Sequence, residues 1–63
     1  MNVQKGQKLE IIGNSIFECM GHKKVTGTVF VVRADGSGCS IRCDQTRCIE
    51  TVDFNDGDVK VVA

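Results

Sequence analysis

The 63-residue sequence predicts an all-β protein, in which five short strands close into one small barrel. Three observations carry this prediction. Val and Ile make up most of the apolar residues, and clusters of Gly, Asn and Asp, which favour turns, separate them. Pro, Trp and Tyr are absent. No segment of ten or more residues has the apolar spacing of an amphipathic helix. We therefore expect a single all-β domain spanning residues 1–63.

Residues 7–12 form the first expected strand, because apolar side chains follow a turn-like Lys-Gly pair. A long connection, residues 13–23, comes next. The segment from Ser15 to Lys24 has enough apolar side chains for a helical turn or two. However, Gly13 and Gly21 bracket this segment. We therefore predict an ordered loop here.

Residues 25–33 form the strongest expected strand. Its consecutive apolar residues, Val29 to Val32, are typical of a central strand that is covered on both faces. Gly27 interrupts the pattern, which indicates a bulge or a sharp bend where a Cβ atom would collide with a neighbour. The next segment, Ala34 to Gly38, predicts a hairpin turn, because Asp-Gly and a second Gly supply positions of positive φ.

The remaining strands are shorter. Residues 39–43 alternate between apolar and polar side chains, so one face of this strand is expected to be buried. A polar turn leads into a strand over residues 48–52, and a turn at residues 53–57 leads into a last strand over 58–62. The residues expected to share the barrel core are Leu9, Ile11, Val29, Val31, Ile41 and Val61.

Composition excludes several classes of protein. Eight Lys and Arg balance eight Asp and Glu, which argues against a strongly basic nucleic-acid binder and an acidic tail. The longest apolar run has four residues, whereas a membrane span needs about 20. The N-terminal segment lacks the apolar region of a secretory signal, so we expect a cytoplasmic protein.

The order of the expected elements resembles that of SH3-like small barrels, in particular the KOW, Tudor and chromo-type modules. Lys5 to Ile12 is similar to the K-G-x-x-V-x-V opening strand, and Val25 to Val32 is similar to the x-G-x-V-x-x-V second strand. The resemblance covers residues 5–62 and implies a module that binds nucleic acid, modified peptides or proteins, without catalysis. Two features depart from it. The aromatic residues that line peptide or methyl-lysine cages are missing, and so is the basic excess of a KOW module.

Four cysteines and one histidine are the candidate metal ligands. Their spacing, C-x2-H and then C-x3-C-x4-C, lacks the two close pairs that are typical of structural zinc sites. Cys43 is expected opposite Cys48 across a hairpin, where the two side chains can pack as thiols or oxidise. We favour buried free thiols over a disulfide or a metal site, and expect no metal or cofactor. The ligand candidates are Cys19, His22, Cys39, Cys43 and Cys48.

The sequence offers no catalytic constellation. His22 follows Cys19 by three residues without a third group to orient it, so we interpret it as an exposed loop residue. Asp53, Asp56 and Asp58 lack the spacing of an EF-hand and its closing Glu, and a turn explains them better. No phosphate-binding loop, nucleophile elbow or dinucleotide fingerprint occurs. We therefore predict that the protein is not an enzyme.

Charge is distributed unevenly along the chain. Residues 1–33 contain five Lys and Arg against two acidic residues, whereas residues 34–63 contain three against six. The folded protein is therefore either dipolar, with one basic face, or its charges interleave at the surface.

Two functions fit these observations. We favour a small non-enzymatic module that docks on a larger protein or complex as an adaptor or modulator. The alternative is a KOW-like module that binds nucleic acid or ribonucleoprotein through its Lys-rich first half. A homodimer through an exposed strand edge is a further option.

The resemblance also suggests where a partner binds. In SH3-like barrels the loop after the first strand commonly forms the contact surface, and by resemblance this loop is Asn14 to Lys24. Its large apolar residues are either interface anchors or a cap on one open end of the barrel. The expected contact residues are Ile16, Phe17, Met20, His22, Lys23 and Lys24.

Overall fold

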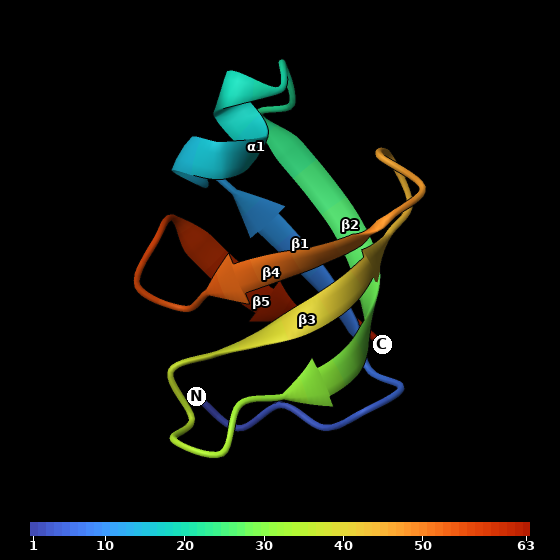
Figure 1. The fold of residues 1–63 in the computed structure, drawn as a ribbon, viewed down its shortest axis with the longest axis vertical. Coiled ribbons are helices and arrows are strands. Elements are labelled where there is room, and N and C mark those ends of the chain that lie inside the picture. The colour runs from blue at the N-terminus through green and yellow to red at the C-terminus, as the bar shows by residue number, and fades with distance from the viewer.

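The computed structural model describes all residues from 1 to 63 and contains one five-stranded antiparallel sheet (Figure 1). Its strands are β1 (Lys8–Ile12), β2 (Lys24–Val32), β3 (Gly38–Cys43), β4 (Ile49–Asp53) and β5 (Asp58–Val61). The strand order is β4-β3-β2-β1-β5, so the strongest expected strand, β2, is central. The all-β class is confirmed, and each strand begins and ends within one residue of its expected limits.

The expected closure of the sheet into a barrel is not confirmed. In Figure 1, β3 and β4 cross in front of β1 and β5, so the sheet folds over itself. However, β4 and β5 form its two edges, and no backbone pairing joins them. The structure is therefore a strongly curved open sheet with two free edges.

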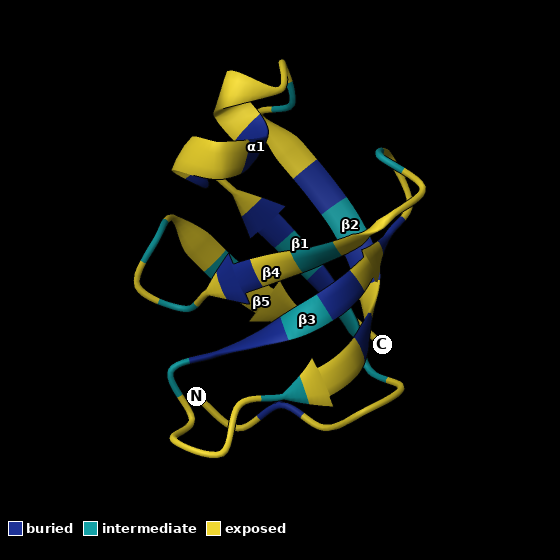
Figure 2. Cartoon of the chain, viewed as in Figure 1, coloured by how far each residue is buried: buried dark blue, intermediate teal, exposed yellow.

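The hydrophobic core lies on the inner face of this sheet (Figure 2). Four of the six expected core residues, Leu9, Ile11, Val29 and Ile41, are buried. The six expected residues do not include Val3 of the N-terminal segment, Phe17 of the β1–β2 connection, or one further valine in each of β2 and β4. The two buried cysteines agree with the expectation of buried thiols. The complete core consists of Val3, Leu9, Ile11, Phe17, Val25, Val29, Cys39, Ile41, Cys43 and Val52.

The prediction that Val31 belongs to the core is wrong, because β2 contains a bulge. Val29 pairs with Ile41, but the next pair is Val31 with Ser40, so Phe30 is an extra residue in the strand. The bulge reverses the alternation of the side chains. Val29 is 2% exposed and Val31 is 53% exposed. The second half of β2 is therefore not covered on both faces.

The prediction for Val61 is also wrong, for a different reason. Val61 pairs with the buried Leu9, so its side chain lies on the inner side of the sheet. However, β5 is an edge strand, and no further strand covers its free side. Val61 is consequently 38% exposed.

Gly27 allows β2 and β3 to approach closely. A Cβ atom at this position would lie 2.7 Å from the carbonyl oxygen of Arg42, so the predicted collision is confirmed. The bulge itself lies further along β2. In the hairpin turn, Gly36 has the expected positive φ of 75°, whereas Gly38 does not. Gly38 is instead buried at the start of β3, where a Cβ atom would meet the carbonyl oxygen of Val52.

The segment after β1 contains a short helix, α1 (Ser15–Cys19), where the sequence predicted a loop. Asn14 begins the helix, because its Oδ1 accepts hydrogen bonds from the backbone N–H groups of Ile16 at 3.0 Å and Phe17 at 3.3 Å. No helix in the structure has the length or apolar character needed to span a membrane.

Gly21 ends α1 rather than preventing it. Its φ is 88°, a conformation that favours glycine. The N–H of Gly21 donates to the carbonyl of Glu18, and the N–H of His22 donates to the carbonyl of Phe17, both at 2.9 Å. This pair of hydrogen bonds is the Schellman motif, which satisfies carbonyls at a helix end. The prediction of a loop was therefore wrong because one bracketing glycine is a helix cap.

Candidate functional site

The expected contact residues lie at one end of the sheet, on α1 and in the residues that connect it to β2 (Figure 1). The structure divides the three apolar ones. Phe17 is only 1% exposed and belongs to the core, so its assignment to the contact surface is corrected. Ile16 and Met20 are 55% and 43% exposed. Of the three apolar residues, only Ile16 and Met20 therefore remain accessible to a partner.

Ile16 and Met20 form what we call the α1 patch. Met20 is the C-cap residue, directly after the end of α1, and it follows Ile16 by four positions, the spacing of about one helical turn. Phe17 points into the core instead. Figure 2 shows that α1 is largely exposed apart from its buried contact with the sheet.

The turn between β4 and β5 holds the N-terminus of α1. Ser15 donates its backbone N–H to Oδ1 of Asp56 at 3.1 Å and its hydroxyl to Oδ2 at 2.6 Å. The side-chain amide of Asn14 donates to the backbone carbonyl of Asp56 at 3.2 Å. The hydrogen bonds from Ser15 lower the pKa of Asp56 below its ordinary value. These contacts fix the position of α1 relative to the sheet.

The three remaining expected contact residues do not form one basic surface. His22 is half-buried, and Lys23 is exposed with no carboxylate within 4.0 Å. Lys24 begins β2 and places its Nζ 3.3 Å from Oε2 of Glu10. Glu10 also lies 3.8 Å from Nζ of Lys60. Lys23 is therefore the only one of the two lysines whose charge is not partnered.

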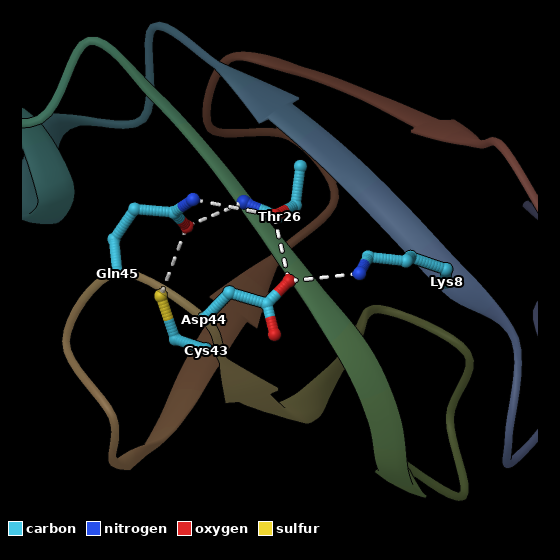
Figure 3. Close-up of polar contacts among 5 residues, drawn as sticks. All are labelled: Lys8, Thr26, Cys43, Asp44 and Gln45. Carbon is cyan, nitrogen blue, oxygen red and sulfur yellow. Dashed lines mark hydrogen bonds and ion pairs between the residues drawn. The ribbon is translucent and has the colours of Figure 1, made fainter.

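Polar side chains cover the outer face of the sheet near the β3–β4 turn (Figure 3). Oδ2 of Asp44 lies 3.0 Å from Nζ of Lys8 and accepts a hydrogen bond from the Thr26 hydroxyl at 2.7 Å. These contacts, the one from Thr26 first, lower the pKa of Asp44. Gln45 accepts from the backbone N–H of Thr26 at 2.8 Å. The turn is thus folded back onto β2.

The ion pairs join the two halves of the chain. Lys8 pairs with Asp44, and Lys60 pairs with Glu10, so positive and negative residues from different halves lie side by side. Exposed pairs of this kind contribute little to stability, because water and salt screen the two charges. They do reduce the positive potential of the surface, because they place a carboxylate beside Lys8, Lys24 and Lys60. This arrangement favours the interleaved surface over the dipolar one.

The cysteines divide into two groups. Cys39 and Cys43 are buried, as expected, and burial raises the pKa of Cys39. Cys19 on α1 and Cys48 after the β3–β4 turn are exposed, so the prediction of buried thiols is wrong for these two. All four thiols are free. No group of three or more His, Cys, Asp or Glu side chains converges in a way that could hold a metal ion.

The contact that holds α1 could not be found from the sequence. Asp56 and Ser15 are 41 positions apart, and no sequence motif links an aspartate and a serine at that separation. A local signal did exist for the helix itself, since an Asn precedes the segment and a Gly follows it at the spacing of two caps.

The structure contains no pocket. The candidate site is the exposed apolar patch formed by Ile16 and Met20. Comparisons of the chain with protein-family models, with curated proteins and with solved structures find no match.

Proposed function

We propose that the protein is a small non-enzymatic module that docks on a larger protein or complex through the α1 patch. One observation carries the proposal. The side chain of Phe17 packs in the core and attaches α1 to the sheet, whereas Ile16 and Met20 are exposed to solvent. Large apolar residues on a surface contribute most to binding when they enter a pocket on the partner.

The anchoring of α1 supports this function. Its first residue is bonded to Asp56, and both of its ends are capped. A binding element that is already held in position loses less conformational entropy when it associates. The proposal retains the expectation, taken from the resemblance to SH3-like modules, that the segment after the first strand makes the contact.

The side chains in and near the α1 patch indicate which kind of surface a partner would need. Ile16 and Met20 require an apolar depression, and Met adapts to surfaces of irregular shape. Lys23 lies close by in sequence and has no carboxylate of its own within 4.0 Å, so an acidic group beside the depression would complement it. We therefore propose a protein partner with an apolar groove and an acidic rim.

Nucleic-acid binding is the less favoured function. Lys8, Lys24 and Lys60 each lie beside a carboxylate, which reduces the charge available for phosphates. The exposed face of the sheet also offers few aromatic side chains for base stacking, because Phe30 is the only exposed aromatic residue.

Site-directed photo-crosslinking tests the proposal. A photoreactive amino acid is placed at Ile16 or at Met20, with Val31 as a matched control, because Val31 is an equally exposed apolar residue on another element. Each variant is irradiated in native lysate with and without nuclease. We expect one nuclease-resistant protein adduct from positions 16 and 20 that position 31 does not give. Adducts that disappear after nuclease treatment would favour the nucleic-acid function, and equal labelling from all three positions would contradict the α1 patch.

A further inference from the structure

The two free edges of the sheet present different backbone groups. Val62 donates its N–H to the carbonyl of Lys8 at 2.9 Å, next to the paired residues Leu9 and Val61. Hydrogen bonding alternates along an antiparallel ladder, so Asp58 and Lys60 bond to β1. The N–H and C=O groups of Val59 and Val61 therefore point to the free side of β5. On β4, the backbone N–H of Cys43 donates to the carbonyl of Cys48 at 2.9 Å in the adjoining hairpin. By the same alternation, the residues whose backbone groups point to the free side of β4 are Ile49, Thr51 and Asp53.

The inner faces of the two edges differ in polarity. On β5 the inner positions are Val59 and Val61, which pair with the buried Ile11 and Leu9. On β4 the inner positions include Glu50, which pairs with the buried Ile41 and is itself half-buried. An inward-pointing charge is a device that blocks the addition of another strand to an edge. The β5 edge carries no such charge, so it is the edge that can accept a strand.

We propose that two copies of this chain pair through β5, antiparallel and related by a two-fold axis. In an antiparallel pair, residues whose backbone groups are free must lie opposite each other. Val59 and Val61 of one copy must therefore face residues of the second copy whose backbone groups also point outward, such as its own Val59 and Val61. Centring the axis on Val59 places Asp58 directly opposite the partner's Lys60, and Lys60 opposite the partner's Asp58. Centring it between Val59 and Val61 would instead place Lys60 opposite the partner's Lys60. Centring it on Val61 would place Lys60 opposite the partner's Val62 and leave Asp58 without a charged partner.

Charge complementarity therefore selects the first arrangement. Opposite charges that face one another across strands are stabilising, whereas like charges are destabilising. Asp58 is exposed and has no ion-pair partner in its own chain. Lys60 is exposed, and it shares Glu10, at 3.8 Å, with Lys24, which lies closer to that carboxylate at 3.3 Å. A second carboxylate facing Lys60 would therefore complement its charge. β4 contains no basic residue, so two copies of β4 cannot form such a pair.

The same geometry explains why assembly stops at two copies. The outward-facing backbone groups belong to inner-face residues on β5, but to outer-face residues on β4. Pairing β5 with a partner's β4 would therefore join the apolar inner face of one sheet to the polar outer face of the other. Pairing β5 with β5 keeps the two inner faces continuous. The β5 pairing is isologous and closed, and it does not propagate into a filament.

The dimer is expected to be weak, because an edge of four residues buries far less surface than a standard interface. We expect a dissociation constant on the order of 100 µM. Sedimentation of the full chain over concentrations from about 10 µM to about 1 mM measures it directly. Asp58→Lys and Lys60→Asp should each lower the association at least tenfold, because each variant places like charges opposite one another.

Mixing the two variants gives the decisive result. In a heterodimer of Asp58→Lys with Lys60→Asp, every cross-strand charge pair is again complementary, so a 1:1 mixture should associate as the wild type does. Thr51→Pro, which removes an outward-facing N–H from the other edge, is the matched control and should leave the dimer unchanged. Thermal unfolding of each variant verifies that the monomer is folded. A wild type that stays monomeric at the highest concentration, or a mixture that fails to associate, would overturn the proposal.

Discussion

α1 and the second half of β2, residues 30–32, both expose large apolar side chains, but for different reasons. On α1 the helical period separates neighbours, so that Phe17 is buried while Ile16 is exposed. In β2 a bulge inserts Phe30 and turns Val31 outward. The surroundings differ as well. The α1 patch is uncovered, whereas the ammonium of Lys5 lies 5.8 Å from the centre of the Phe30 ring.

This difference separates exposure that suggests a function from exposure that follows from backbone geometry. α1 is fixed by caps, by a core residue and by Asp56, and it still presents an apolar surface. The exposure of Val31 follows from the bulge, which places its side chain on the outer side of the sheet opposite Ser40.

The largest expected effect concerns adjacent residues of α1. Phe17→Ala should lower the free energy of unfolding by about 3–5 kcal/mol, because it leaves a cavity in the core. Ile16→Ala, on the exposed side of the same turn, should change it by less than about 0.5 kcal/mol. Chemical denaturation followed by circular dichroism measures both. Similar losses for the two variants would mean that α1 does not have one buried and one exposed side.

The second effect concerns β2 and its neighbour β3. Ile41→Ala should cost about 2–5 kcal/mol, since Ile41 is fully buried. Val31→Ala should cost less than about 0.5 kcal/mol, although simple alternation along the strand would make Val31 a core residue. The same unfolding experiment compares them. A severe loss for Val31→Ala would indicate that β2 has no bulge.

A smaller effect is expected from the cap of α1. Asn14→Ala removes the acceptor for the N–H groups of Ile16 and Phe17, which should cost about 1 kcal/mol. Hydrogen exchange of the α1 amides should accelerate, while exchange in β3 should change little. Asn55→Ala is the matched control, because the side chain of Asn55 makes no hydrogen bond. Equal acceleration in both variants would argue against a specific role of the cap.

The smallest effect depends on pH. The folded-state pKa of Asp56 lies below its ordinary value of 3.8, so the hydrogen bonds from Ser15 add stability above that pH. This contribution should be lost as the pH falls through the folded pKa. Asp35 and Asp44 also have lowered pKa values, so the wild type alone does not isolate Asp56. The melting temperature of Asp56→Asn should therefore fall less steeply between about pH 4 and pH 2 than that of the wild type. Parallel curves for the two proteins would contradict the role of Asp56.

Local patterns in the sequence sufficed for the strands. Val and Ile between turn residues predicted all five, and the predicted collision of a Cβ atom at Gly27 is confirmed. A bulge or bend in β2 was predicted at Gly27, but the bulge lies at Phe30. Its position could not be predicted, because four consecutive apolar residues do not reveal which of them is the extra one. The open sheet could not be predicted either, since closure depends on whether β4 and β5 pair, and their separation in space is not encoded in either strand alone.

The candidate site was predicted as a segment but not as a surface. The apolar residues of the β1–β2 connection drew attention to it, yet their division between core and solvent depends on the helix that forms there. That helix depends on Asn14 and Gly21, which are visible in the sequence, and on Asp56, which is distant. Phe17 could not be assigned to the core until the orientation of α1 was known.

The most direct test of the proposed function is a quantitative capture of partners by paired surface variants. The double variant Ile16→Ser with Met20→Ser removes the α1 patch, and Phe30→Ser with Val31→Ser removes an exposed apolar pair of the same kind from β2. The two variants and the wild type are each immobilised on beads and incubated with nuclease-treated lysate. The captured amount of the protein that crosslinks to position 16 is then quantified by mass spectrometry. We predict that the α1 variant loses this protein at least tenfold while the β2 variant retains it. Retention by the α1 variant, or loss in the β2 variant alone, would contradict the proposal that α1 carries the docking surface.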